Sequence, residues 1–242
     1  CNKNNLLKSI EAAQKNNMML HMHVAETEKE VKDSLKNFGK RPVFYLNDIG
    51  FFDNKVIIAH GIWVNDEEQD ILKEKNISIA ITTESHLKLA SGFAPIKDYL
   101  AKGVNICLGT DGVSSNNNLD MLAEMDFTAK LHKAYNQDPA LLPAWEVVKM
   151  ATINGAKALN KENILGSLEE GKLADIILIN RDNLYAVPMY NIYSHLVYTI
   201  NSSDITDVII NGKVVMEDRK LINVDEKELI EKAKYYQEKI KK

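Results

Sequence analysis

The chain has 242 residues, of which 45% are hydrophobic and 26% charged, and these are ordinary values for a globular protein with a sizeable core. The formal net charge is −4, and no stripe of Lys and Arg alternates with aromatic residues, so nucleic acid is not an expected partner. Two cysteines, Cys1 and Cys107, are too few for a disulfide framework. No apolar run approaches the roughly 18 residues that span a bilayer, and no signal peptide is visible, so we expect a cytoplasmic protein without a membrane partner.

The first part of the sequence alternates short apolar runs with helical patterns. After a helix that stops at Asn16, strands are expected at 18–25, 56–59, 77–82 and 104–108, and helices at 28–37, 42–49, 66–75, 94–102 and 119–135. Apolar strands that alternate with helices in this way are typical of parallel strands buried on both faces. The sequence therefore predicts four βα units.

The pattern changes beyond Pro143. An Ala-rich helix at 145–159 precedes short β segments with Gly between them, at 174–179, 196–199 and 207–215. The pair Asn211-Gly212 is typical of a tight hairpin turn. We expect a small β subdomain and then an amphipathic helix at 226–241. The predicted domain boundaries are 1–165, 166–223 and 224–242.

Ionisable residues follow three of the four predicted parallel strands. His23 and Glu26 lie at the end of the first strand, His60 ends the second, and Asp111 lies on the turn after the fourth. The active site of a parallel α/β barrel gathers at the carboxyl ends of its strands. A single His or Glu at such a place is more often structural, but three strands agree, and a carboxylate near a buried strand is costly unless it binds something. The pattern indicates half of a (β/α)₈ active site.

Five phrases of the sequence occur in the same order in one family of enzymes. They are His23-Val-Ala-Glu-Thr27, Ala59-His-Gly61, the stretch 87–95, Leu108-Gly-Thr-Asp-Gly112 with Ser115-Asn-Asn117, and the stretch 166–175. The chain resembles the amidohydrolase superfamily, in particular its branch of 5-methylthioadenosine/S-adenosylhomocysteine deaminases and related chlorohydrolases. The resemblance implies an α/β fold, namely the C-terminal half (strands five to eight) of a metal-dependent (β/α)₈ TIM barrel, followed by part of a small β-sandwich.

The resemblance also implies roles for the four residues at the strand ends. His23 and Asp111 would bind one divalent metal ion. Zn²⁺ is the first expectation, and Fe, Mn and Ni are the alternatives. Asp111 would also accept a proton, Glu26 would carry a proton to the purine ring, and His60 would orient the attacking hydroxide, so that Glu26 and His60 contact the substrate. The implied reaction is hydrolytic deamination of an adenosine-type nucleoside, a small-molecule partner, with release of ammonia.

His21 requires a separate interpretation, because His21-Met-His23 looks like the His-x-His metal pair of a first barrel strand. Only 88 residues separate His23 from Asp111, which is enough for about three βα steps of roughly 30 residues but not for seven. If Asp111 follows the eighth strand, His23 lies on the fifth. Alternate strand residues share a face, so we expect His21 on the same side, behind the site or in the core.

Two departures from the family pattern leave alternatives open. The branch usually has His and Asn at the positions of Ile81 and His86, and its His-x-His pair is absent, although a catalytic zinc normally has three or more protein ligands. The alternatives are another amidohydrolase activity (a guanine deaminase or chlorohydrolase) or a truncated half-barrel that binds without turnover. Exposed half-barrel edges predict a homo-oligomer or association with a missing N-terminal half.

Overall fold

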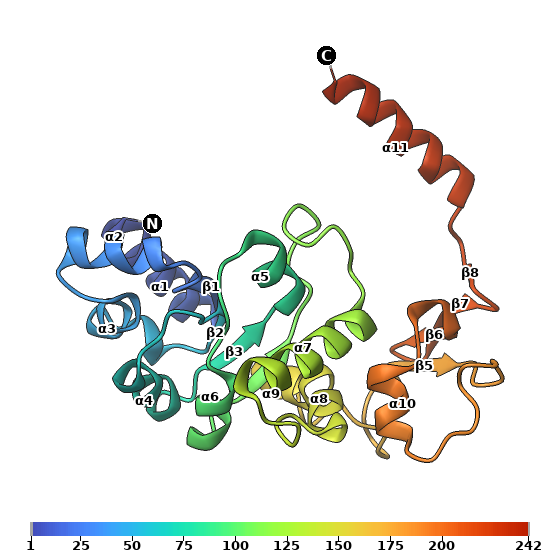
Figure 1. Ribbon diagram of the computed structural model, residues 1–242. Coiled ribbons are helices and arrows are strands. Elements are labelled where there is room, and N and C mark those ends of the chain that lie inside the picture. The colour runs from blue at the N-terminus through green and yellow to red at the C-terminus, as the bar shows by residue number, and fades with distance from the viewer. Residues whose placement is uncertain (1, 242) are drawn as a thin grey trace.

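The computed structural model describes residues 2–241, and its centre is a four-stranded parallel sheet (Figure 1). The strands lie in the order of the sequence, each paired in parallel with the next: β1 (Leu20–Val24), β2 (Val56–His60), β3 (Ser78–Ile81) and β4 (Ile106–Leu108). The four predicted parallel strands are thus confirmed. Since each connection contains at least one helix, all four carboxyl ends meet at one edge of the sheet.

In the part of the chain that the structure describes, nine α-helices accompany the parallel sheet: α1 (Lys3–Asn16), α2 (Glu28–Phe38), α3 (Pro42–Asp48), α4 (Asp66–Glu74), α5 (Thr83–Leu89), α6 (Ile96–Lys102), α7 (Met121–Asn136), α8 (Ala144–Ala151) and α9 (Ile153–Ala158). A short 3₁₀ turn, η1, covers Phe51–Asp53. Local sequence explains several helix ends. Asn65 and Glu68 form a reciprocal capping box at the start of α4, and Pro42 is the first residue of α3.

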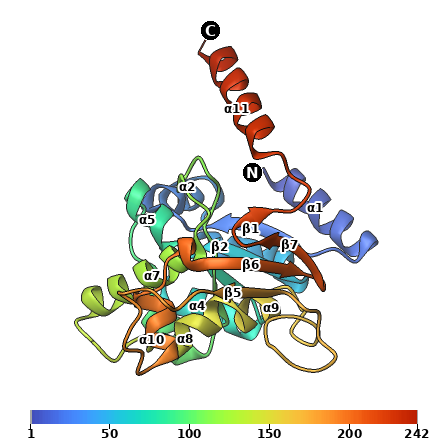
Figure 2. The same ribbon diagram turned by 90° about the vertical axis from the view of Figure 1, so that its right-hand side faces the viewer.

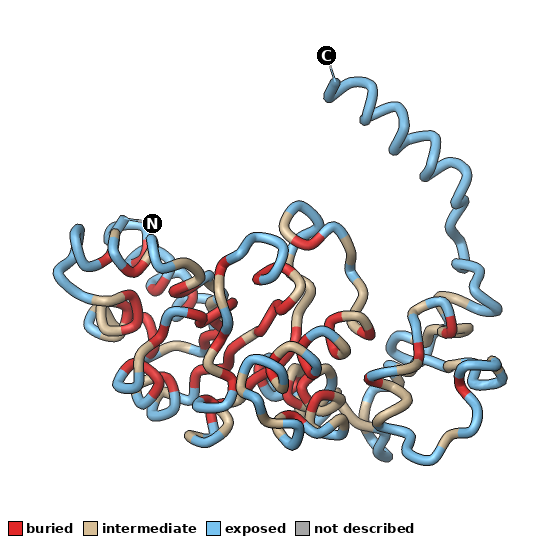
Figure 3. The backbone as a smooth tube through the Cα atoms, in the orientation of Figure 1, coloured by how far each residue is buried: buried red, intermediate tan, exposed pale blue. Residues whose placement is uncertain are grey.

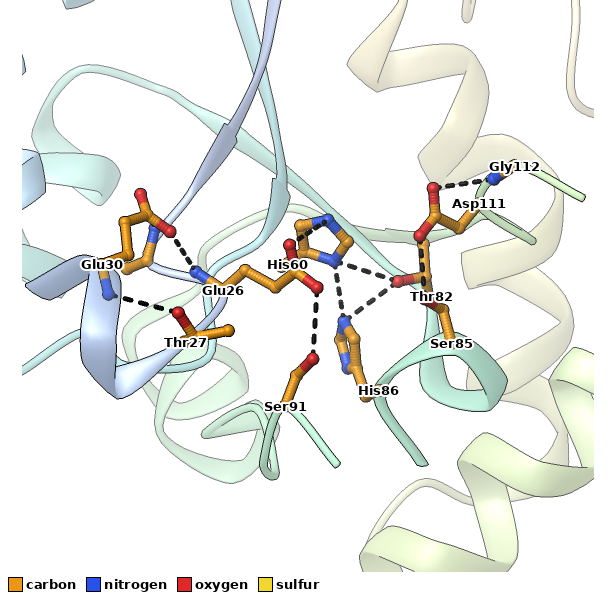
Figure 4. A network of polar contacts seen from close by, with 11 residues as sticks. Glu26, Thr27, Glu30, His60, Thr82, Ser85, His86, Ser91, Asp111 and Gly112 are labelled. Carbon is orange, nitrogen blue, oxygen red and sulfur yellow. Dashed lines mark hydrogen bonds and ion pairs between the residues drawn. The ribbon is translucent and has the colours of Figure 1, made fainter. Parts of the chain in front are cut away.

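Two helical predictions differ from the structure. The helix expected at 145–159 is divided into α8 and α9 at Thr152, whose backbone angles (φ −129°, ψ −97°) are not helical. Helix α5 was not expected, because it begins directly after β3 and has only seven residues. The position of α5 places its side chains beside the carboxyl ends of β2 and β4 (Figure 4).

The core lies around the parallel sheet, where buried segments concentrate (Figure 3). Every residue of β2 is buried, as expected for a Val-Ile-Ile-Ala run between two other strands. Ile58 and Ile79 are wholly enclosed. Strand β1 is at the edge of the sheet and alternates partly buried and exposed residues until Val24. Of the two cysteines, Cys107 is buried and free, and Cys1 lies outside the described residues.

A second sheet is antiparallel and follows the order β5 (Ile176–Ile179), β6 (Ile205–Ile210), β7 (Lys213–Glu217) and β8 (Lys220–Leu221) (Figure 2). The predicted hairpin is confirmed: Asn211 and Gly212 join β6 to β7 with φ of 49° and 74°. Within residues 2–241 no other antiparallel sheet packs against this one.

The strand predicted at 196–199 is wrong. Residues 196–198 belong to a helix, α10 (Ile192–Tyr198), and Thr199 is its C-cap; a 3₁₀ turn, η2 (Ser202–Asp204), follows. The side chain of Asn191 accepts a hydrogen bond from the Ser194 backbone N–H, which caps the helix. Val197 is buried, and α10 packs against α7 and α8. The N-cap and tertiary packing therefore outweigh the β propensity of a short Val-Tyr-Thr run.

The last element is a helix, α11 (Glu226–Ile240), as predicted. It extends away from the rest of the molecule in both views (Figures 1 and 2), and none of its residues is buried. No helix among residues 2–241 has the length and apolar character that crossing a membrane requires.

Candidate active site

The backbone turns sharply at the ends of β1, β2 and β4. Ala25, His60 and Asp111 all have positive φ, at 53°, 75° and 60°. This left-handed conformation is unfavourable for residues other than Gly and costs on the order of 1 kcal/mol or more, and such residues cluster at functional sites. At the end of β1 the turn is held by the Glu30 carboxylate, which accepts hydrogen bonds from the Ala25 and Glu26 backbone N–H groups at 2.9 and 2.8 Å.

Three of the four predicted site residues gather around one point. Donor atoms of His23, Glu26 and His60 lie within 4.8 Å of one another. His60 Nε2 is 3.6 Å from Glu26 Oε2, and the His23 and His60 rings meet edge to face with centroids 4.7 Å apart. Figure 4 shows His60 pointing between Glu26 on one side and α5 on the other. His60 is fully buried, yet its Nε2 has no hydrogen-bond partner, which marks it as an atom available to a ligand.

Glu26 is oriented by a residue to which the sequence analysis gave no role. Ser91 Oγ donates a hydrogen bond to Glu26 Oε1 at 3.1 Å (Figure 4). The carbonyl of Ser91 accepts in turn from Trp63 Nε1 at 2.7 Å, so the serine is anchored on its other side. Ser91 lies in the family-like stretch 87–95, which was the only sequence signal for it.

The inner side of His60 contacts two further residues that the sequence did not indicate as functional. His60 Nδ1 is 3.0 Å from His86 Nε2, and Thr82 Oγ1 lies 3.2 Å from His60 Nδ1 and 3.0 Å from His86 Nε2. All three side chains are buried. Burial lowers the pKa of His60, against the nearby Glu26 charge, and lowers the pKa of His86 to about 3. Both rings are therefore neutral at pH 7.

Asp111 lies on the far side of the Thr82–His86 pair and is not a member of the three-residue cluster (Figure 4). Its Oδ2 accepts a hydrogen bond from Ser85 Oγ at 2.8 Å, and its Oδ1 accepts from the Gly112 backbone N–H at 2.7 Å. Partial burial opposes its ionisation, but these hydrogen bonds and the nearby histidines prevail and lower the pKa of Asp111. Asp111 is consequently a carboxylate at neutral pH.

Helix α5 carries Ser85 and His86, and Glu124 of α7 binds the N-terminal end of this helix. The fully buried Glu124 carboxyl group accepts hydrogen bonds from the Thr83 backbone N–H and, at 3.4 Å, from the Glu84 backbone N–H. Burial raises the pKa of Glu124 to about 8. The side chain thus anchors the start of α5 and with it the contacts to His60 and Asp111.

His21 shares a face of β1 with His23, as expected from strand alternation, but it is not in the core. Both residues are exposed, because β1 is the edge strand and the described chain leaves this face open. His21 and His23 line a cavity of about 560 Å³ together with residues of α2 and α3.

Comparison with known proteins gives one family. The model of the amidohydrolase family matches residues 1–215. The chain is 45% identical to a 5-methylthioadenosine/S-adenosylhomocysteine deaminase of Thermodesulfovibrio yellowstonii over 241 residues, which cover 100% of this chain and 55% of the relative. It is 47% identical to a 5'-deoxyadenosine deaminase of Methanocaldococcus jannaschii, covering 96% of this chain and 55% of the relative.

Solved structures agree with this result. An adenosine deaminase from Xanthomonas campestris with bound zinc superposes with a TM-score of 0.96 at 35% identity, over 99% of this chain and 55% of that one. The zinc complex of an atrazine chlorohydrolase from Arthrobacter aurescens superposes with a TM-score of 0.86 at 28% identity, over 93% of this chain and 50% of that one.

The chain spans about half the length of the curated relatives it matches. The predicted resemblance to the 5-methylthioadenosine/S-adenosylhomocysteine deaminase branch is confirmed by several relatives of that name at 43–47% identity. From the residues matched, this chain belongs to the amidohydrolase family.

Proposed function

We propose that this chain contributes strands five to eight of a (β/α)₈ barrel to an aminohydrolase that removes the amino group of an adenosine-type nucleoside. Methylthioadenosine and S-adenosylhomocysteine are the expected substrates, since relatives of this branch carry those names. One observation carries the proposal: the carboxyl ends of β1, β2 and β4 bring His23, Glu26, His60 and Asp111 to one edge of a parallel sheet.

A divalent cation fits this edge. Neither Glu26 nor Asp111 has a Lys or Arg partner among the described residues, so two partly buried carboxylates share a region without a balancing cation. Imidazole nitrogen and carboxylate oxygen are the ligands of catalytic Zn²⁺ sites. We assign His23 and Asp111 as the ligands from this chain. When bound, such an ion supplies a nucleophile by lowering the pKa of a water molecule to about 7.

The protein groups then divide the proton transfers. Asp111 is ionised and held by Ser85 and Gly112, so it can accept a proton. Glu26, oriented by Ser91, carries a proton to a ring nitrogen of the purine. His60 Nε2, which has no hydrogen-bond partner and lies 3.6 Å from Glu26 Oε2, hydrogen-bonds the attacking oxygen. Two carboxylates with separate environments suit a reaction in which one proton is taken and another delivered.

Two ligands are fewer than a catalytic zinc normally has, so we propose that further ligands come from a segment outside this chain. Among the described residues β1 pairs only with β2, which leaves its other edge open beside His21 and His23. A companion N-terminal segment would close the barrel along that edge, and a second copy of the chain is the alternative. In this scheme residues 1–165 are the barrel part, 166–223 a β-sandwich segment and 224–242 a C-terminal helix.

Another amidohydrolase reaction is the second candidate. The branch usually has His and Asn where this chain has Ile81 and His86, and the chain also superposes on an atrazine chlorohydrolase. A guanine deaminase or chlorohydrolase activity would follow from an altered pocket next to β3, whereas a half-barrel that binds without turnover would show none.

The test is ammonia release from methylthioadenosine by the zinc-loaded protein expressed from the complete open reading frame. We expect turnover in the parent protein, and a fall on the order of 10³-fold or more with Asp111→Asn, because one carboxylate serves as ligand and proton acceptor. Asp182→Asn, at an exposed loop position, is the matched control and should leave the rate unchanged. Metal-loaded protein that leaves every adenosine analogue intact contradicts the proposal, and ammonia from guanine or chloride from a chlorotriazine favours the second candidate.

Measuring the bound zinc of two variants distinguishes the roles of the two carboxylates. Asp111→Asn should lose zinc, whereas Glu26→Gln should keep zinc and lose turnover, because only Asp111 is assigned as a ligand. Zinc retained by Asp111→Asn but lost from Glu26→Gln would instead assign the metal to the cluster of His23, Glu26 and His60.

A further inference from the structure

The proton on the His60 ring has only two possible places. A neutral imidazole carries one hydrogen, on Nδ1 or on Nε2. His60 Nε2 faces the Glu26 carboxylate, with 3.6 Å between Nε2 and Oε2. An N–H in this direction is attracted by the carboxylate, whereas a nitrogen lone pair is repelled by it. The electrostatics of the site therefore favour the hydrogen on Nε2.

A hydrogen on Nε2 leaves Nδ1 as an acceptor, and this atom is buried between Thr82 and His86. The two ring nitrogens are 3.0 Å apart, so one hydrogen must lie between them. With His60 Nδ1 accepting, that hydrogen belongs to His86 Nε2. The Thr82 hydroxyl can rotate and either donate or accept, so it adapts to the pair and does not select a tautomer. The His86 ring is 2% exposed and cannot adapt in the same way.

We propose that His86 is a positioning residue, which donates its Nε2–H to His60 Nδ1 and thereby holds the His60 proton on Nε2, facing the site. The inference deepens the proposed function, because it gives His60 a hydrogen-bond donor aimed at the attacking oxygen. It also accounts for the departure from the family pattern at this position. An Asn side chain has an N–H donor as well, so His86 replaces one donor by another.

The measurement is the ¹⁵N–¹H long-range correlation spectrum of the metal-free protein, from its complete open reading frame, with ¹⁵N-labelled histidine at pH 7.5. This pH lies above the ordinary pKa of a histidine side chain, about 6.5, so a neutral ring is the expected form. We expect His60 and His86 both as Nε2–H tautomers. A His60 ring protonated on Nδ1 overturns the proposal without any variant, and so does a His86 ring protonated only on Nδ1.

Three variants then assign the effect to His86. His86→Leu removes the donor and should shift the His60 tautomer ratio about fivefold toward Nδ1–H, which corresponds to the net contribution of one hydrogen bond. His86→Asn should restore the parent ratio, because its amide donates. Thr82→Val is the matched control, since it removes the other neighbour of Nδ1 and should keep His60 as Nε2–H.

An unchanged His60 spectrum in His86→Leu overturns the proposal, as does an equal shift in Thr82→Val. If circular dichroism shows that His86→Leu does not fold, the tautomers of the parent protein and of Thr82→Val still test the proposal. Because no metal or substrate is present, the result is independent of turnover: the expected spectrum together with an inactive enzyme would reject the proposed function and keep the His86 assignment.

Discussion

The two sheets differ in how they hold their apolar side chains. All five residues of β2 are buried, and the parallel sheet encloses residues such as Ile58 and Ile79 completely. In the antiparallel sheet, Ile177 and Leu178 of β5 are 47% and 48% exposed. Helix α11 has no buried residue. The parallel sheet therefore makes its own core, whereas the antiparallel sheet and α11 present apolar surface that favours a partner. This comparison can be tested by substitutions that are matched between the two regions.

The largest difference is expected for removal of a buried side chain. Ile79→Ala in β3 should lower the free energy of unfolding by about 2–5 kcal/mol, because it leaves a cavity in a packed core. Ile177→Ala in β5 should change it by no more than about 0.5 kcal/mol if its surface stays exposed. Urea denaturation of both variants gives the comparison. Equal losses would show that β5 is covered in the assembled protein and that the two sheets do not differ.

The next effect is a pH dependence that arises from Glu124, a buried residue of the parallel region. The pKa of Glu124 is raised from 4.5 to about 8, so its contribution to stability is fully present below pH 4.5 and is lost as the pH rises through 8. Between these values this group should lower the free energy of unfolding by at most about 1.4 kcal/mol per pH unit. Glu124→Gln imitates the neutral acid and should remove this slope.

The matched control for this prediction is Glu170→Gln, at an exposed position before β5. Urea midpoints at pH 5, 6.5 and 8 should give the same pH slope for this variant as for the parent protein. A slope that survives in Glu124→Gln would assign the titration to another group.

The smallest effect concerns helix caps. The side chain of Asn65 accepts from the Glu68 backbone N–H at the start of α4, and Asp225 accepts from the Lys227 and Glu228 N–H groups at the start of α11. Asn65→Ala should cost about 1 kcal/mol of global stability, because α4 is packed on the core.

Asp225→Ala should reduce the far-ultraviolet helical signal of α11 without moving the denaturation midpoint, because no residue of α11 is buried in the described chain. A shared loss of about 1 kcal/mol would instead show that α11 is docked, and would remove the contrast between the two regions.

The elements that the sequence predicted well are those with strong local signals. The apolar runs that became β1 to β4 and the Asn211-Gly212 turn were found because periodicity and turn chemistry act over a few residues. The strand prediction for 196–199 was wrong, because packing against α7 and α8 places these β-branched and aromatic residues in a helix. Local preference is decisive only where tertiary contacts do not oppose it.

The candidate site was predictable to the extent that it lies at strand ends. His23, Glu26 and His60 lie at the carboxyl ends of β1 and β2 and come together as expected, and their functional roles stay a prediction. Their partners were not visible in advance. His86 reaches His60 only because it lies on the unexpected helix α5, and Thr82 is the residue that precedes this helix. The contact between the two histidine rings joins residues 26 positions apart in the sequence. Side chains that orient others have no pattern of their own, since many polar residues could occupy the same position.

The left-handed turns at Ala25, His60 and Asp111 set limits on how this protein can evolve. Glycine relieves such a conformation and Asn or Asp tolerate it, whereas β-branched residues are strongly disfavoured there. A library selected only for thermal stability should therefore accept Gly or Asn at position 111 as readily as Asp, and so lose the carboxylate that faces the site. A library selected for turnover should keep it. At this position the sequence records which of the two pressures has acted.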